Sequence, residues 1–198
     1  MQFAIFSAAQ ASIINPNFED GLDGWNDLSS TGTVIASGGF AEFTGGDGDD
    51  GLSALLVQGD DGSFSFSTPI QLNAHASKFE FSLWLINKFD DETETGGSLY
   101  GDRFSVVFYD SLDSAFDLFF HGLDFTLGGL ISLDVSALAG RDVAISFELR
   151  DEDDGFNVKV GVDNLVFIER ATVPESSSLI LIIIGLLSLV ASRRFVTP

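Results

Sequence analysis

The 198-residue chain contains no cysteine, which excludes disulfide bonds, thiolate metal sites and cysteine nucleophiles. Positive charge is also scarce, with nine Lys and Arg against 30 Asp and Glu and a formal net charge of −21. A surface of that sign repels phosphate backbones, which argues against nucleic-acid binding. Most of the carboxylates fit a solvated acidic surface, and the acidic excess also suits cation binding.

Groups typical of catalysis are few. His75 and His121 are the only histidines, stand in no triad or metal-binding spacing, and are expected in loops or at strand ends. A glycosidase needs two carboxylates facing each other across a cleft, and no local pattern singles out such a pair. The sequence therefore favours a protein that is not an enzyme, with a polysaccharide-acting enzyme as the alternative.

The chain has 20 Phe and 21 Gly, a composition that favours strands and tight turns over helices. Apolar and polar residues alternate with a period of two over 79–86 and 143–149, and likewise over 104–108 and 158–162. Shorter candidate strands lie at 33–37, 40–44, 52–58, 63–68, 116–121 and 130–135. About ten strands, each with one apolar face, predict an all-β domain over 12–172, built as a two-sheet antiparallel β-sandwich of jelly-roll type.

The first eleven residues are apolar and end in Ala9-Gln10-Ala11, a small-x-small pattern. This pattern predicts a partial signal peptide over 1–11 that is cleaved after Ala11. A first buried strand is the alternative interpretation.

The opposite end carries a second apolar segment. Val173-Pro174-Glu175 precedes the apolar run 179–192, and Arg193 and Arg194 follow it. Fourteen residues form a helix of about 21 Å, shorter than the ~30 Å hydrocarbon core, and the arginines mark its cytoplasmic end. The order of these parts resembles the PEP-CTERM sorting signal, although Ser176 replaces the second proline of the usual motif. The resemblance implies, over 173–198, transient inner-membrane anchoring, processing by an exosortase-type protease, and delivery to the cell surface or extracellular matrix. A plain single-pass anchor is the alternative.

Three motifs resemble galactose-binding-like and carbohydrate-binding-module jelly rolls. Residues 15–25 (NPNFEDGLDGW) are similar to the opening strand of that family, 133–149 to its penultimate strand, and 161–165 (GVDNL) to its final strand. In this family the first and last strands often share a structural calcium ion. The resemblance thus assigns Glu19 and Asp163 as metal ligands here. Calcium needs six to eight oxygens, so Asp49 or Asp50 is expected to add a third carboxylate. Ordinary surface carboxylates are the alternative.

Aromatic faces flanked by polar side chains are the expected means of binding a glycan. Trp84 projects opposite Phe79 and Phe81 and is a candidate for an open sheet face, although an aromatic residue in a sandwich strand is more often part of the core. Tyr100 and Tyr109 are further candidates, bordering a long polar loop at 90–102. Trp25 follows the opening motif and is expected to have a structural packing role.

These features predict an exported structural or adhesive protein of the cell surface or matrix, with glycan contact. Proteins with a tail of this kind commonly accompany exopolysaccharide and biofilm, as the resemblance implies. Two alternatives stay open: an enzyme acting on polysaccharide on the same scaffold, and a purely structural subunit of a filament or homo-oligomer.

Overall fold

The computed structural model describes residues 12–46, 52–60, 68–86, 103–110, 115–122, 129–151 and 158–170, together with Ile182. This part of the chain contains eleven strands and one turn of 3₁₀ helix. Their bounds are β1 Asn26–Asp27, β2 Thr33–Ala36, β3 Ala41–Thr44, β4 Leu52–Gln58, β5 Ile70–Gln71, β6 Ala76–Leu85, β7 Arg103–Asp110, β8 Ala115–Gly122, β9 Gly129–Asp134, η1 Ser136–Leu138, β10 Asp142–Arg150 and β11 Lys159–Glu169.

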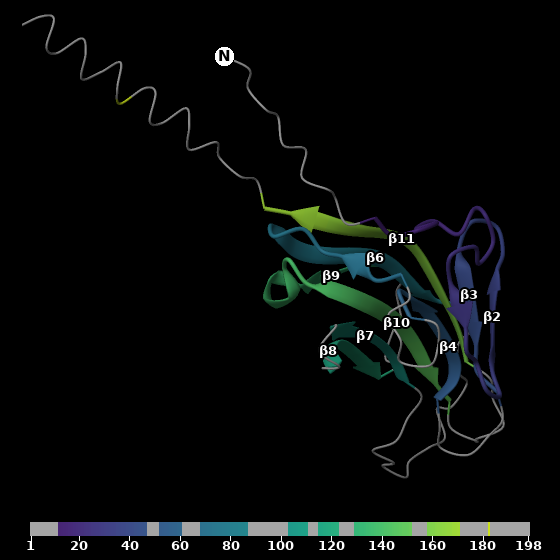
Figure 1. Cartoon of the computed structure of the whole chain (residues 1–198). Helices are drawn as coiled ribbons and strands as arrows, with labels where there is room; N and C mark the ends of the chain where they lie inside the picture. The colour runs from purple at the N-terminus through teal and green to yellow at the C-terminus, as the bar shows by residue number, and fades with distance from the viewer. Residues whose placement is uncertain are drawn as a thin grey trace, which may run out of the picture.

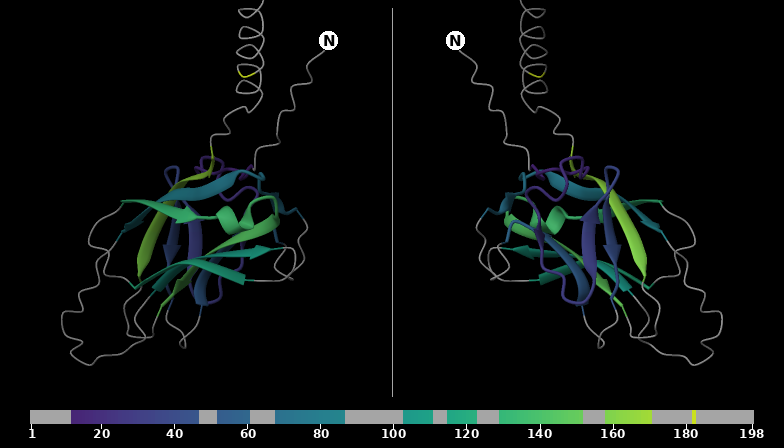
Figure 2. Two further views of the ribbon diagram at one scale, coloured as in Figure 1. Left: turned by 90° about the vertical axis from the view of Figure 1, so that its left-hand side faces the viewer. Right: turned by 90° about the vertical axis from the view of Figure 1, so that its right-hand side faces the viewer.

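The strands form two sheets that face each other, as Figures 1 and 2 show. Sheet A has the order β1-β4-β10-β7-β8, with β5 pairing the first two residues of β10, and sheet B has the order β2-β3-β11-β6-β9. Every pairing is antiparallel. The chain crosses repeatedly between the sheets, since β6 lies in sheet B, β7 in sheet A, β9 in sheet B and β10 in sheet A. The predicted two-sheet antiparallel β-sandwich is confirmed.

The core lies between the sheets and is built largely from phenylalanine. Phe79, Phe81 and Leu83 of β6 are fully buried, and so are the alternating residues Ile145 and Phe147 of β10. The side-chain period of a strand is two, so each run places its apolar residues on the inner face, as the alternation predicted. The ring of Phe147 is central, with ring centroids within 6.4 Å in Trp25, Phe43, Phe79, Phe81 and Phe104.

The opening motif does not form the strand that its resemblance predicted. Residues 14–24 run through bends and turns, because Asn15 and Phe18 adopt positive φ angles of 48° and 53° and Gly21 and Gly24 are also left-handed. Left-handed residues cannot continue a strand. The segment still packs against the core, since Phe18 is 1% exposed and Trp25 is 6% exposed. The expected structural role of Trp25 is confirmed, and its indole Nε1 donates a hydrogen bond to the Ile14 carbonyl at 3.1 Å.

Most of the other expected strands differ by one or two residues at their ends, and 52–58 is matched by β4. The larger differences are that β6 begins three residues before the expected run at 79–86 and that β11 continues seven residues past the run at 158–162. The candidate at 63–68 lies outside the described residues apart from Thr68, which is not in a strand. β1 and β5 were not predicted, since two residues are too few for an alternation to show. His75 occupies the exposed turn before β6, as expected, and His121 is the next-to-last residue of β8.

Candidate functional site

The two described aromatic candidates lie on opposite outer faces of the sandwich. Tyr109 belongs to β7 of sheet A, where Phe104, Val106 and Phe108 enter the core and the alternate residues face outward. Trp84 belongs to β6 of sheet B and alternates with core residues in the same way. The packed core separates the two outer faces, so Trp84 and Tyr109 cannot contribute to one site.

Tyr109 stands near the opposite end of β7 from the point where the long loop joins that strand. It is the next-to-last residue of β7, whereas the loop at 90–102 leads into the first residue, Arg103. At ~3.3 Å per residue, the strand places them roughly 20 Å apart. The loop itself lies outside the described residues, so the expectation that Tyr109 borders it stays a prediction.

Tyr109 lines a hollow on the outer face of sheet A, called the Tyr109 hollow here. Its volume is about 310 Å³, and it is lined by Leu28, Leu52, Leu55, Val57, Asp60, Tyr109 and Glu148. The aliphatic residues come from β4 and the segment before β2, which continues alongside β4 through the hydrogen bond from the Leu28 N–H to the Leu55 carbonyl at 2.9 Å. Ligand sites commonly combine such an apolar wall with a few polar groups.

The polar groups of the Tyr109 hollow are held by hydrogen bonds between strands. Glu148 of β10 is 9% exposed, and its Oε1 accepts from the Ser146 hydroxyl at 3.0 Å and from the Tyr109 hydroxyl at 3.4 Å. Asp60 follows β4 and is 8% exposed, and its carbonyl accepts from the Asn26 side-chain amide. The Glu148 carboxylate, held by these two donors, keeps further lone pairs for a ligand hydroxyl.

Sequence reasoning missed Asp60 and Glu148 as site residues. Glu148 was on the polar side of the predicted alternation at 143–149, so its outward direction was readable. Its hydrogen-bond partner, Tyr109, could not be read from the sequence. The two side chains meet because β7 pairs with β10, with Tyr109 opposite Ala144, and these paired residues are 35 positions apart in the sequence. Only the pairing of these strands reveals the site.

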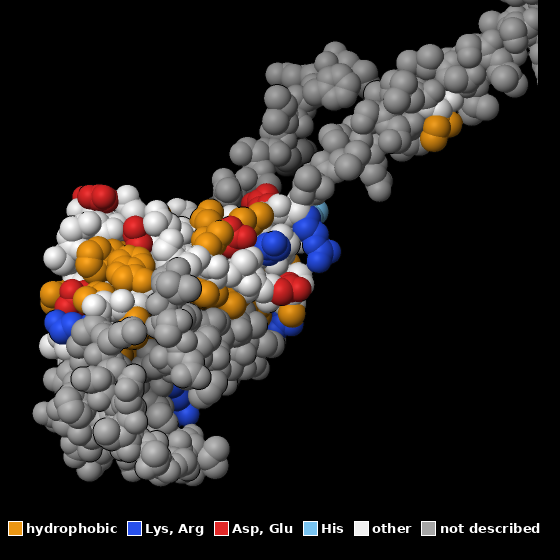
Figure 3. Space-filling model, turned by 180° about the vertical axis from the view of Figure 1, so that it is seen from behind, with side chains coloured by type: hydrophobic (Ala, Val, Ile, Leu, Met, Phe, Trp, Pro, Cys, Tyr) orange, Lys and Arg blue, Asp and Glu red, His pale blue; other side chains and the backbone are white. Residues whose placement is uncertain are grey.

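On sheet B the indole of Trp84 lies over Gly161 of β11, its partner across the strands. A Cβ atom at Gly161 would come within 2.6 Å of the indole Nε1, so only glycine fits beneath the ring. Phe40 contacts the indole edge-on, with ring centroids 5.1 Å apart. Ile35, Leu130 and Val166 of neighbouring strands are 45–65% exposed on the same face. Figure 3 shows hydrophobic side chains standing among acidic and basic ones on this side of the molecule.

The two predicted metal ligands come from segments that lie beside each other. The Leu165 N–H donates to the Pro16 carbonyl at 3.0 Å, which joins the opening segment to the last strand. Glu19 points its carboxylate at Gly39, and the Asp163 carboxylate accepts from the Asn164 N–H at 2.6 Å and from its side-chain amide at 2.8 Å. The described residues contain no group of three or more acidic or histidine side chains that could hold a metal ion.

Several predicted residues lie outside the described part of the chain. They are Asp49 and Asp50, Tyr100, the signal segment 1–11, the motif Val173, Pro174 and Glu175, and Arg193 and Arg194. Of the apolar run 179–192 only Ile182 is described. Among the described residues no helix has the length and hydrophobicity needed to cross a membrane.

No family model matches the chain, and no curated protein matches it. Solved structures with a similar fold include a variant of a family 29 carbohydrate-binding module, at 13% identity and a TM-score of 0.46, covering 73% of this chain and 81% of the module. TmCBM61 in complex with β-1,4-galactotriose shares 14% identity with a TM-score of 0.46, covering 82% of this chain and all of the other. The Clostridium thermocellum xylanase 10B CBM22-1-GH10 modules, complexed with xylohexaose, share 12% identity with a TM-score of 0.47, covering 79% of this chain and 28% of theirs. At these identities and scores, none of them assigns a ligand to this chain.

Proposed function

We propose that this protein binds a polysaccharide, without cleaving it, through the Tyr109 hollow on the outer face of sheet A. The observation that carries the proposal is the pairing of an aliphatic wall, from Leu55 and Val57, with the hydroxyl of Tyr109 and the carboxylates of Asp60 and Glu148 in one hollow. Sugar rings combine apolar C–H faces with hydroxyl groups, so they match both halves of such a surface. The chain's net charge of −21 also favours a neutral or weakly charged ligand over a polyanion.

Each polar group has a defined part in this proposal. The Tyr109 ring offers its face and edge to a sugar, since aromatic side chains provide a large contact area that loses little conformational entropy. Glu148 and Asp60 accept hydrogen bonds from sugar hydroxyls, and a charged acceptor makes such bonds stronger. Ser146 holds Glu148 in place through its 3.0 Å hydrogen bond, so the acceptor is positioned before the ligand arrives.

Replacing Tyr109 with Ala is expected to weaken retention on polysaccharide affinity gels by about thirtyfold or more, as for tyrosine residues that dominate other binding interfaces. Tyr109→Phe keeps the ring and loses only the hydroxyl that contacts Glu148, so it should retain part of the affinity. The measurement is electrophoretic mobility in gels containing soluble glycans, with thermal melting to show that each variant folds. Unchanged retention of a folded Tyr109→Ala protein on every glycan that the parent binds would contradict the proposal.

Trp84→Ala is the matched variant on the opposite face. The Trp84–Phe40 pair is the second candidate glycan platform, because the indole lies flat on the outer face of sheet B with Gly161 beneath it. If the Tyr109 hollow is the site, Trp84→Ala retains the glycan as the parent does. Loss of retention in Trp84→Ala, with Tyr109→Ala unaffected, would assign binding to sheet B instead.

The same hollow also tests the enzyme alternative, because Asp60 and Glu148 both line it. Two carboxylates flanking a sugar are the usual requirement of a glycosidase. We expect no release of reducing ends from any glycan that the protein retains. Turnover that disappears in Glu148→Gln would overturn the non-enzymatic part of the proposal.

A structural calcium ion between Glu19 and Asp163 belongs to this proposal, supported by the hydrogen bond that joins Pro16 to Leu165. A ligand that binds the native state at a hundredfold excess over its Kd adds about 2.7 kcal/mol of stability. Calcium is therefore expected to raise the melting temperature by about 5–11 °C in a domain of this size. Glu19→Gln or Asp163→Asn should remove most of that response, and magnesium should give little of it. Identical melting curves in chelator and in millimolar calcium would show that both carboxylates are ordinary surface charges.

We place this binding function at the cell surface or in the extracellular matrix, with a filament or homo-oligomer as the alternative form of assembly. The support for this location is the order of the Val173-Pro174-Glu175 motif, the apolar run and the two arginines in the sequence. The intact mass of protein recovered from its native cells reports whether an exosortase-type protease has removed the tail. A full-length chain in the inner membrane would contradict the location.

A further inference from the structure

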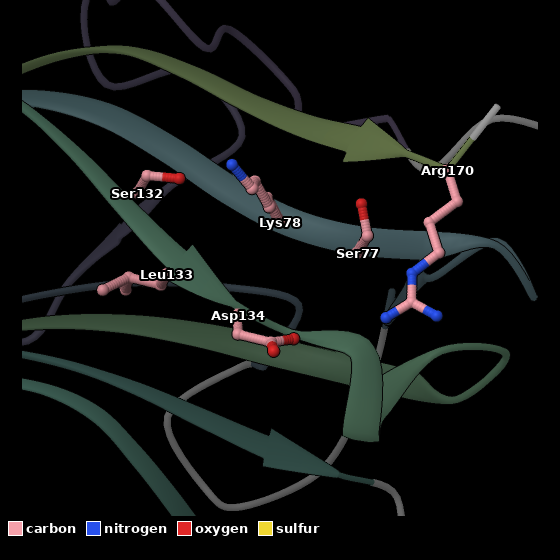
Figure 4. A pocket seen from close by; sticks show the side chains of 6 residues that line it. All are labelled: Ser77, Lys78, Ser132, Leu133, Asp134 and Arg170. Carbon is pink, nitrogen blue, oxygen red and sulfur yellow. The ribbon is translucent and has the colours of Figure 1, made fainter.

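A second hollow lies at one end of sheet B, called the Arg170 hollow here. Its volume is about 540 Å³, and it is lined by Ser77, Lys78, Ser132, Leu133, Asp134 and Arg170. Figure 4 shows these side chains on three neighbouring strand ends, with the Arg170 guanidinium reaching down from the end of β11 toward the side of Asp134. The Arg170 hollow is in sheet B, so it is separate from the Tyr109 hollow on sheet A.

Strand register brings these residues together. Lys78 of β6 lies between Asp134 of β9 and Ile168 of β11, its partners on the two sides. Arg170 follows β11 directly, and its N–H donates to the His75 carbonyl at 2.8 Å, which fixes the strand end beside the start of β6. Two cationic side chains that are 92 residues apart in the sequence therefore line one hollow.

Neither cation is neutralised within the described part of the chain, although acidic residues outnumber basic ones threefold. Lys159 pairs with Glu42 and Arg141 with Asp110, whereas Lys78 and Arg170 form no ion pair with a described residue. The carboxylate of Glu80, two residues along β6 from Lys78, instead accepts from the Ser132 hydroxyl at 2.9 Å.

Asp134 is held in the hollow by its own turn. Its Oδ1 accepts from the Ser136 N–H at 2.8 Å. Hydrogen bonds from the Ser136 hydroxyl and N–H lower the pKa of Asp134, and the charges of Arg170 and Lys78 lower it further. Asp134 is therefore ionised at neutral pH. Two cations and one carboxylate leave the hollow with a net charge of +1, on a molecule whose total is −21.

We infer that the Arg170 hollow binds a sugar that carries a single carboxylate, such as a lone hexuronate unit in an otherwise neutral polysaccharide. Arg170 donates two parallel hydrogen bonds to the carboxylate, and Lys78 adds a second positive charge beside it. Asp134 accepts hydrogen bonds from the ring hydroxyls, and the Ser77 and Ser132 oxygens have lone pairs left to do the same.

The charges of the hollow favour this ligand over a phosphate. A phosphate monoester carries about −1.5 to −2 charges, and Asp134 would repel it from within the hollow. A monocarboxylate matches the net +1, and only a ligand with neighbouring hydroxyl groups gives Asp134 a favourable contact. A neutral sugar would leave the hollow's net charge of +1 uncompensated.

The test is a calorimetric titration of the full chain with the methyl glycosides of galacturonate and of glucuronate, each of which carries one carboxylate. The methyl esters of the same two glycosides are the matched probes, because they keep the ring hydroxyl groups and lose the charge. We expect one of the acids to bind, and its ester to bind at least tenfold more weakly. Lys78→Gln and Arg170→Gln should each lower the affinity for the acid by about tenfold to a hundredfold. Arg170→Lys should recover only part of the affinity, since lysine has no planar fork.

Lys159→Gln is the control variant, because Lys159 is a cation of the same sheet that already pairs with Glu42. Lys159→Gln should leave the affinity for the acid unchanged. Tyr109→Ala should also leave it unchanged, which means that this inference and the proposed function can fail independently. Three results would each overturn it. They are the absence of binding by either acid at millimolar concentration, equal binding of acid and ester, and tighter binding of inorganic phosphate than of the acids.

Discussion

Replacement of Phe147 with Ala is expected to lower the melting temperature by about 6–20 °C. The side chain is fully buried, and its ring contacts rings from both sheets and from the opening segment. Truncation of a buried phenylalanine to alanine costs about 3–5 kcal/mol, because the lost contacts leave a cavity. That cost is a large share of the ~5–15 kcal/mol by which a domain is stable, and each kcal/mol corresponds to about 2–4 °C here. Differential scanning calorimetry measures the change.

Two variants show whether the loss comes from the cavity. Phe147→Leu refills much of the space and should lower the melting temperature by clearly less than Phe147→Ala. Phe40→Ala removes the same atoms from a half-buried ring on the outer face of sheet B, so it should cost little. If Phe147→Ala and Phe40→Ala have similar melting temperatures, the core is not organised around Phe147.

The second large decrease in melting temperature is expected from Gly32→Ala. Gly32 lies where the chain leaves the edge of sheet A and enters β2 of sheet B, and its N–H donates to the Ser53 carbonyl at 2.9 Å. A Cβ atom there would clash with the Thr44 carbonyl oxygen and lie 3.0 Å from the Ser53 carbonyl. Both obstacles are backbone atoms of strand ends, which cannot move aside as a flexible side chain can. Overpacking of this kind costs about 1–3 kcal/mol, which lowers the melting temperature by about 2–12 °C.

Gly129→Ala is the matched control for this effect. Gly129 is the first residue of β9, and an added Cβ atom would meet nothing within 4 Å. Gly129→Ala should therefore melt at nearly the same temperature as the parent protein. In Gly46→Ala the new Cβ atom would clash with the Thr31 carbonyl, so the melting temperature should fall about as much as in Gly32→Ala. Equal melting temperatures for Gly32→Ala and Gly129→Ala would mean that the two sheets can separate slightly at this crossing without cost.

The sequence alone was enough to predict the class of fold. A side-chain period of two is a local property of an extended backbone, so the runs at 79–86 and 143–149 predict both the strands and the side of each that is buried. The outward directions of Trp84 and Glu148 follow from the same alternation. Local pattern failed where the backbone departs from the extended state, as at Asn15 and Phe18, because positive φ angles at non-glycine residues leave no periodic signal.

The sites were decided only by tertiary structure. Which strands become neighbours depends on pairings between distant segments, such as β6 with β9 and β11, and no local pattern encodes them. These pairings place Trp84 and Tyr109 on opposite faces, although both are outward-facing aromatic residues of consecutive strands. They also bring Lys78 and Arg170 into one hollow. Strand pairing is not readable from a local pattern, because the hydrogen bonds and side-chain packing that stabilise a sheet form only when the whole sandwich closes.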